Sequence, residues 1–464
     1  MEQRQVELAE VDLPDFGLPT VEPRIERAEY EGRLRSLQER AAERGLDALI
    51  IYADREHSAN LAFLTGFDPR FEEALLILKA GRRPVLVVGN ECFSYASISP
   101  LELDRRLYQP FSLPGQDRSK TVPLASILRD AGVQEGVRVG VVDWKAHGPE
   151  VGRDAALWIN APAYLASILQ QVTGRAPENA TGLLNNPRDG LRTANSVDQL
   201  ACFEFAATHI TTSMRRVILG LRAGMTGLEA IALGGLNGLP LSMHPVLAAG
   251  PYASMSLVSP SNRRLELGDP MLLGLGVWGA LSARAGFLVH DARELPEGIR
   301  DYVERLVAPY FAAIVEWYER VGEGVRAGDL YDVIHRRLGD PFFGISLNPG
   351  HLIHLDEWVD SPFYPESDIE LRSGMAIQVD VIPATGGPYF SSNIEDGIAL
   401  ADEPMRKAFA KRWPEAWSRI RARRTFMQDV LGIRLRPEVL PFSNLAAWLP
   451  PYLLRPRRAM RVRS

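Results

Sequence analysis

The stretch that decides the fold carries three short polar motifs in a fixed order. The first is Gly-His-Leu-Ile-His-Leu-Asp-Glu at residues 350–357, the second is Gly-Met-Ala-Ile-Gln-Val-Asp at 374–380, and the third is Ile-Glu-Asp-Gly at 394–397. In the second motif aliphatic residues alternate with Gln378 and Asp380, which predicts a strand with the carboxylate on the face opposite the aliphatic side chains. Histidine and carboxylates from separate strands are what a divalent ion needs, or an acid–base pair around a polarised substrate.

Around these motifs, the second half of the chain has the pattern of helices that cover a largely antiparallel sheet. Ser196 and Gln199 have the spacing of a capping box. Apolar residues then recur at spacings of three and four as far as Leu221, which predicts one long amphipathic helix. After about residue 400 we expect a helix followed by an irregular tail. The fold class of this half is α+β.

The first half alternates helical spacing with short apolar runs. Helical spacing begins near Ile25 and stops at Gly45, and the apolar runs that predict buried strands are 48–52, 74–78, 85–88 and 137–142. This alternation predicts an α/β domain with a mixed sheet. We therefore expect an extended arm over residues 1–23, an N-terminal α/β domain over 24–184, and a second domain with a C-terminal extension over 192–464.

Composition narrows the classes of function. The net charge of -6 gives no reason to expect nucleic acid as a partner. Only Cys92 and Cys202 occur, which does not make a disulfide framework and favours a reducing compartment. We see no export signal at the N-terminus and no apolar stretch of the roughly 20 residues that a membrane span needs. The sequence predicts a cytoplasmic protein with no membrane association.

The order and spacing of the three motifs resemble the metallopeptidase half of the creatinase, prolidase and aminopeptidase-P family. In that family a Gly-His pair supplies one metal ligand, a Gly-Met strand ends in a ligand Glu, and an Ile-Glu-Asp triplet supplies the last. The match puts His351, Asp380 and Glu395 at ligand positions, with Asp380 where the family has Glu. The resemblance covers most of residues 24–400. It implies a pita-bread C-terminal domain preceded by a smaller α/β domain of the creatinase type.

The same resemblance shows that the site is divergent. Gly274 and Ala283 stand where the family has metal-ligand aspartates, and Leu257 stands where it has a pocket histidine. Gly and Ala have no donor atoms, and two dications close together repel strongly without bridging carboxylates. We therefore do not expect the usual dinuclear metal centre. Creatinase also lacks both metal aspartates and acts without metal, although its proton-transferring histidine would be Leu257 here.

Two chemistries stay open for the expected catalytic residues, which are His351, Asp380, Glu395 and Glu357. A single divalent ion held by the first three would activate water. Alternatively, no cofactor is bound, and His351 is the acid or base while Glu395 or Asp380 orients it or binds a cationic substrate. Glu357 is a candidate for the pocket wall. If Arg284 points inward, it would pair with Glu395 or bind a substrate carboxylate.

The resemblance implies a hydrolase of the Xaa-Pro peptidase or creatinase type, which cleaves a C–N bond in a small amino-acid-derived or peptide-like substrate. It also implies a homodimer. Two alternatives stay open: a catalytically silent pita-bread protein that binds or scaffolds, and the same fold used for a lyase or rearrangement reaction on a specialised metabolite. His354 is expected to be structural, because strand alternation directs it away from His351.

Overall fold

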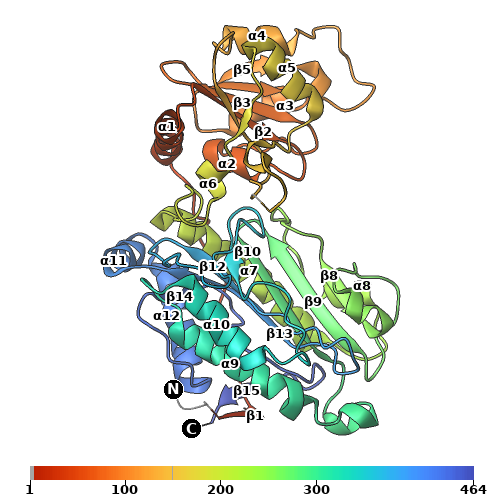
Figure 1. Cartoon of the computed structure of the whole chain (residues 1–464). Coiled ribbons are helices and arrows are strands. Elements are labelled where there is room, and N and C mark those ends of the chain that lie inside the picture. The colour runs from red at the N-terminus through yellow and green to blue at the C-terminus, as the bar shows by residue number, and fades with distance from the viewer. Residues whose placement is uncertain (1–4, 149, 464) are drawn as a thin grey trace. The chain divides into compact units, whose positions relative to one another are not determined.

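The computed structural model describes residues 5–148 and 150–463, and the chain divides into two compact units (Figure 1). Ile25–Thr193 forms one, called here the N-terminal unit. Met1–Arg24 and Ala194–Ser464 together form the other, the C-terminal unit. The segment before residue 25 therefore belongs to the unit that the second half of the chain builds. Within the described ranges, no helix is long and apolar enough to cross a membrane.

The N-terminal unit is built on a six-stranded sheet with the order β5-β4-β3-β2-β6-β7. Its strands are β2 (Ala48–Ala53), β3 (Ala74–Lys79), β4 (Val85–Val88), β5 (Asp104–Leu107), β6 (Val139–Val142) and β7 (Glu178–Asn179). β2 pairs antiparallel with β3 and parallel with β6, so the sheet is mixed, as the sequence predicts. β2 is buried along its whole length because helices cover both of its faces.

Period-two alternation along β2 divides the packing of this unit into two cores. Leu49 and Ile51 pack with the helices on one face, which are α1 (Arg27–Glu43), α2 (Ala59–Thr65), α3 (Cys92–Tyr95) and α6 (Gly182–Asn185). Ile50 and Tyr52 pack with those on the other, α4 (Leu124–Asp130) and α5 (Ala163–Thr173). Short 3-10 turns complete the unit: η1 (Ala96–Ile98), η2 (Gln109–Phe111) and η3 (Ala155–Leu157).

The C-terminal unit is built on an antiparallel sheet, which confirms the predicted arrangement. The strand order is β11-β12-β13-β10-β9-β8, and β14 also pairs with β13. The strands are β8 (Val246–Ala249), β9 (Pro270–Val277), β10 (Ala280–Phe287), β11 (His351–Leu352), β12 (Ala376–Asp380), β13 (Asn393–Leu400) and β14 (Val439–Pro441). The three polar motifs therefore lie on three strands that are neighbours in the sheet: β11, β12 and β13.

Helices cover one face of this sheet. They are α7 (Val197–Gly220), α8 (Gly227–Ala232), α9 (Ala308–Arg320), α10 (Ala327–Leu338), α11 (Glu403–Arg412) and α12 (Pro414–Thr425). Shorter turns are η4 (Gly250–Met255), η5 (Ala292–Glu294), η6 (Glu297–Ile299), η7 (Val303–Val307) and η8 (Phe426–Val430). Phe203 of α7 and Phe311 of α9 share one large core with Leu273, Val379 and Ile394 of the sheet. The opposite sheet face carries the polar side chains of the three motifs and, on β8, β9 and β10, a small apolar cluster of Val246, Leu272 and Ala285.

The two ends of the chain meet in a small sheet of their own. β1 (Val6–Glu10) pairs antiparallel with β15 (Arg458–Val462). Arg461 lies 2.8 Å from the Glu7 carboxylate, and Arg455 lies 2.8 Å from that of Glu10. The prediction of an irregular C-terminal tail is therefore wrong at its end, because basic side chains of the tail pair with acidic side chains of β1.

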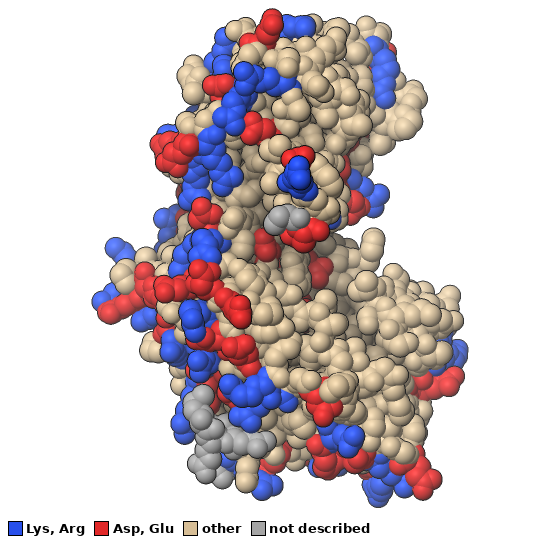
Figure 2. All heavy atoms as spheres, viewed as in Figure 1, with Lys and Arg blue, Asp and Glu red and all other residues tan. Residues whose placement is uncertain are grey.

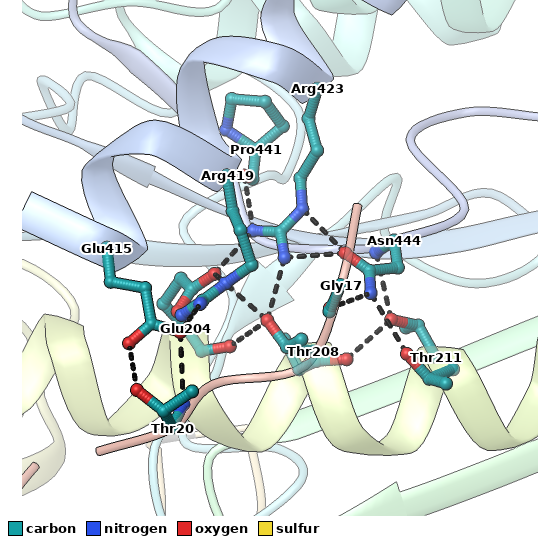
Figure 3. A network of polar contacts seen from close by, with 12 residues as sticks. Gly17, Thr20, Glu204, Thr208, Thr211, Glu415, Arg419, Arg423, Pro441 and Asn444 are labelled. Carbon is teal, nitrogen blue, oxygen red and sulfur yellow. Dashed lines mark hydrogen bonds and ion pairs between the residues drawn. The ribbon is translucent and has the colours of Figure 1, made fainter. Parts of the chain in front are cut away.

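A buried charge network joins α7, α12 and the N-terminal segment (Figure 3). The Glu204 carboxylate, which is fully buried, accepts hydrogen bonds from Arg419 at 2.6 Å and from Arg423 at 2.7 Å. Arg423 also donates to the Asn444 side-chain oxygen at 2.6 Å, and the Asn444 amide donates to the Gly17 carbonyl at 3.2 Å. One carboxylate thus holds two guanidinium groups of α12, and the network ties the N-terminal segment to the C-terminal unit.

Candidate active site

The candidate site lies on the face of the C-terminal sheet opposite the large core. Strand register aligns five residues in one row across it, in the order Val246, Gly274, Ala283, Glu395 and Asp380. Residues directly opposite each other on antiparallel strands point to the same face, so this row shares one face. The row has an apolar half on β8, β9 and β10 and a carboxylate half on β13 and β12.

The three residues that the motifs put at ligand positions do converge. His351, Asp380 and Glu395 are buried, and each offers a ligand atom within 4.8 Å of the other two. Nε2 of His351 lies 3.7 Å from Oε1 of Glu395. The other ring nitrogen, Nδ1, lies 3.2 Å from the Leu352 carbonyl oxygen. A proton on Nδ1 donated to that carbonyl leaves the Nε2 lone pair for the cluster, which is the arrangement of a metal-ligating histidine.

Buried polar atoms without partners mark the centre of the cluster. Nε2 of His351 and Oδ1 of Asp380 have no hydrogen-bond partner within the described residues. A buried polar group left unpaired costs about 1–3 kcal/mol. A divalent ion would take up these atoms, because imidazole nitrogen and carboxylate oxygen are ordinary ligands of Zn²⁺ and related ions.

Burial and mutual repulsion disfavour charge in the cluster when no cation is present. Burial raises the pKa of Glu395 to about 8, and the nearby Glu357 carboxylate adds to this effect. Burial, followed by repulsion from Glu395, raises the pKa of Asp380 well above its ordinary value. Burial lowers the pKa of His351 and so favours the neutral ring. A bound dication would lower both carboxyl pKa values, because it stabilises carboxylates.

Glu357 lies beside the cluster, on the irregular segment that follows β11. Its charge acts on the pKa values of Asp380 and Glu395, and burial raises its own pKa. The neighbouring Trp358 stacks on the His351 ring, with centroids 4.2 Å apart and an interplanar angle of 16°. The contact of Trp358 with His351 was not predicted from the sequence. The signal available was only an aromatic residue next to Glu357, which does not reveal a stacked geometry.

Arg284 does not join the cluster, so the prediction that it points into the pocket is wrong. Its side chain is 1% exposed and lies on the core face of the sheet. Its Nη2 donates to the Asp396 carboxylate at 2.6 Å, and its Nε donates to the Trp448 carbonyl at 2.8 Å. Toward Glu395 it reaches only the backbone oxygen, at 3.4 Å. Strand alternation explains this, because the neighbouring Ala283 faces the site.

Replacing Arg284 by lysine is expected to lower the free energy of unfolding by about 1–3 kcal/mol, because lysine cannot satisfy this forked set of acceptors and leaves buried ones unpaired. Affinity for a divalent ion is expected to stay within twofold. Urea denaturation and metal titration of the same preparation check both statements. A variant of unchanged stability that binds ions or ligands differently would show that Arg284 acts in the site after all.

His354 and Leu257 lie apart from the cluster. His354 is fully buried, and its ring meets the Phe203 ring of α7 edge-on with centroids 4.9 Å apart. This location agrees with the structural role expected for His354, but strand alternation does not produce it, because β11 ends at Leu352. Leu257 is 80% exposed on the segment after η4.

The residues present fit one metal ion and not two. Ala283 lies directly opposite both Gly274 and Glu395 in the sheet register. Among the described residues, the one group of donors suited to a metal ion is His351, Asp380 and Glu395. The two positions at which the family carries further aspartates are thus beside the cluster, but neither side chain has a donor atom. Gly274 on β9 and Ala283 on β10 therefore supply no side-chain ligand for a second metal ion.

Comparison with known proteins gives a consistent picture. Residues 33–144 match the family model of the creatinase/prolidase N-terminal domain. The fold resembles that of dipeptidase PepE from Mycobacterium ulcerans, with 20% identity, a TM-score of 0.59, and coverage of 82% of this chain and 95% of that one. An Xaa-Pro dipeptidase from Bacillus anthracis has 14% identity, a TM-score of 0.60, and coverage of 81% and 96%.

A prolidase from Pyrococcus horikoshii OT3 has 15% identity, a TM-score of 0.61, and coverage of 80% of this chain and 95% of that one. Among curated proteins, no sequence matches this chain. At such low identities the structural likeness shows the fold. The predicted fold class, a pita-bread domain preceded by a smaller creatinase-type α/β domain, is confirmed.

Proposed function

We propose that this protein, whose residues 33–144 match the creatinase/prolidase N-terminal domain and whose fold resembles that of Xaa-Pro peptidases, is a hydrolase with a single divalent ion. The ion would be held by His351, Asp380 and Glu395, and the reaction would cleave a C–N bond in a small amino-acid-derived or peptide-like substrate. The observation that carries the proposal is the convergence of these three buried side chains within 4.8 Å.

The chain's own residues have separable roles in this proposal. A bound divalent ion supplies Lewis acidity and lowers the pKa of water. Glu357 is the remaining carboxyl beside the cluster, and we assign it the transfer of a proton to the leaving nitrogen. Burial raises its pKa, which suits a general acid near neutral pH. Trp358 holds the His351 ring in place through the stacked contact.

Hydrolysis by the metal-loaded full chain tests the proposal. We would assay Ala-Pro, Leu-Pro and the arylamides of alanine and leucine, and measure release of the free amine. Replacing Glu357 by glutamine is expected to reduce kcat about 10²–10⁴-fold while the metal content stays the same, because general acid–base catalysis contributes about that factor. Absence of hydrolysis in every metal-loaded sample, or full activity of the Glu357→Gln variant, would contradict it.

A silent binding protein is the second candidate, and one observation favours it. Val246, Gly274 and Ala283 leave half of the site row without any donor atom. Retention of three converging ligand-type residues opposes it. Metal binding without turnover of any probe would support this candidate. A lyase or rearrangement reaction, the metal-free chemistry of His351, and the homodimer all stay predictions from the resemblance.

A further inference from the structure

Gln378 is a buried amide on the site face to which the proposed function gives no role. It is 0% exposed and lies two residues before Asp380 on β12, so both side chains point to the same face of the sheet. The register places it directly opposite His351 on one side and directly opposite Gly397 on the other. Gln378 therefore lies among the residues that surround the proposed ion.

The amide of Gln378 lies across β13 and reaches the next strand, β10. Its Nε2 donates to the Leu281 carbonyl at 2.7 Å. The reverse orientation would place Oε1 against that carbonyl oxygen, so Leu281 determines which end of the amide points toward β10. The Gln378 side chain also hydrogen-bonds to the Glu395 carboxyl group. Because Oε1 has no partner among the described residues, the second hydrogen of Nε2 is the donor in this bond.

Gly397 leaves the space that this amide occupies. A Cβ on Gly397 would lie 2.8 Å from Oε1 of Gln378, which is closer than such atoms approach. Among the described residues, it would meet no other side chain within 4 Å. Gly397 has no positive φ, so its backbone conformation does not require glycine. The glycine is therefore needed at this position for the Gln378 side chain alone.

This arrangement of Gln378 is unfavourable for the stability of the fold. Oε1 is buried without a hydrogen-bond partner among residues 5–148 and 150–463. A buried acceptor that is left unpaired raises the free energy of the folded chain, and an aliphatic side chain at the same position would have no such acceptor. A residue kept only for packing does not need this amide, whereas the contact with Glu395 does.

The β10 side of Glu395 has no charged donor among the described residues. Ala283 and Gly274, which follow Glu395 in the row, have no donor atom, and Arg284 lies in a salt bridge on the other face. Residues 230–262, which include β8, contain no Asp, Glu, Lys or Arg, and Figure 2 shows the surface near α8 and β8 as largely uncharged. An amide N–H donates to a carboxyl group in either protonation state, so the amide contact does not depend on charge.

We propose that Gln378 is a positioning residue for the single-ion site. Its amide is held by the Leu281 carbonyl, has room because residue 397 is glycine, and fixes the Glu395 side chain so that one arrangement of this ligand is presented to the ion. Partners of this kind orient metal ligands, and their loss typically lowers metal affinity about 10–100-fold. The inference rests on the proposed function in taking Glu395 as a ligand of the ion.

Titration of the metal-free full chain with Co²⁺ tests the inference. Gln378→Ala is expected to weaken Co²⁺ binding about 10–100-fold. It is also expected to change the visible absorption spectrum of the Co²⁺-loaded protein, because the Glu395 side chain is no longer held. Ser282→Ala is the matched control, because Ser282 of β10 likewise donates to a carboxylate of β13, that of Asp396 at 3.3 Å, but on the core face. It should keep the wild-type affinity and spectrum.

A double-mutant cycle with Gly397→Ala separates positioning from general damage to the fold. This substitution should weaken Co²⁺ binding in the wild type, but not further in Gln378→Ala, where the amide that it would displace is absent. Thermal melts confirm that the variants fold. Wild-type affinity in Gln378→Ala, additive effects of the two substitutions, or an equal effect of Ser282→Ala would each overturn the inference and leave the single ion in place. If the wild type bound no Co²⁺, the proposed function would be contradicted, and the inference with it.

Discussion

Replacing His351 by alanine is expected to reduce the affinity for a single divalent ion by more than about 100-fold, while the chain stays folded. Loss of an outer-shell partner already costs about 10–100-fold in metal affinity, and here the nitrogen ligand itself is removed. His351 supplies the one nitrogen of the cluster, and its Nε2 has no partner in the part of the chain that the structure describes. Two neighbouring carboxylates alone hold an ion much less specifically.

Titration of metal-free protein with Co²⁺ or Zn²⁺ measures this loss. His354→Ala is the control, because His354 is equally buried in the same segment but packs on Phe203 in the large core. That variant is expected to bind the ion as the wild type does and to unfold at lower urea concentration. If His351→Ala bound the ion as tightly as the wild type, the ion would lie elsewhere.

Replacing Glu204 by glutamine is expected to lower the free energy of unfolding of the C-terminal unit by about 3–5 kcal/mol. Removing one partner of a buried ion pair leaves an uncompensated buried charge, and here a single carboxylate serves two buried guanidinium groups (Figure 3). Arg423 has no exposed surface, so water cannot compensate for the lost partner. The network also ties α7 to α12, so the change acts on the packing of both helices.

Urea denaturation followed by tryptophan fluorescence measures this effect. Glu415→Gln is the matched control, because Glu415 pairs with Arg419 at 3.0 Å but its side chain is 42% exposed. An exposed ion pair contributes about 0–1 kcal/mol, so the control should change little. Similar destabilisation of the two variants would mean that the buried pair contributes no more than a surface one.

Much of the site was predictable from sequence, because the order and spacing of the three motifs identify its residues. His351 begins β11, Asp380 ends β12 and Glu395 lies near the start of β13, and antiparallel pairing of these strands brings the three residues together. Strand alternation also predicts the direction in which the Arg284 side chain points. If Ala283 faces the site, its neighbour in a regular strand faces the core, and the expectation of an inward arginine neglected that rule.

Other features depend on contacts that local patterns do not show. The Glu204–Arg423 pair joins residues far apart in sequence, and neither position differs in pattern from an ordinary helix face. Pairing of β1 with β15 likewise needs the two chain ends to meet. Trp358 lies on an irregular segment, where side-chain direction follows from the particular backbone path and not from a period.

The measurement that tests the central claim most directly is the metal content of the protein, by elemental analysis after loading with Mn²⁺, Co²⁺ or Zn²⁺ and removal of free ions. We expect close to one ion per chain, and loss of that ion in Asp380→Asn. Two ions per chain would contradict the single-ion site, because Gly274 and Ala283 offer no donors for a second. No retained ion in any loaded sample would contradict the metal-dependent reaction itself.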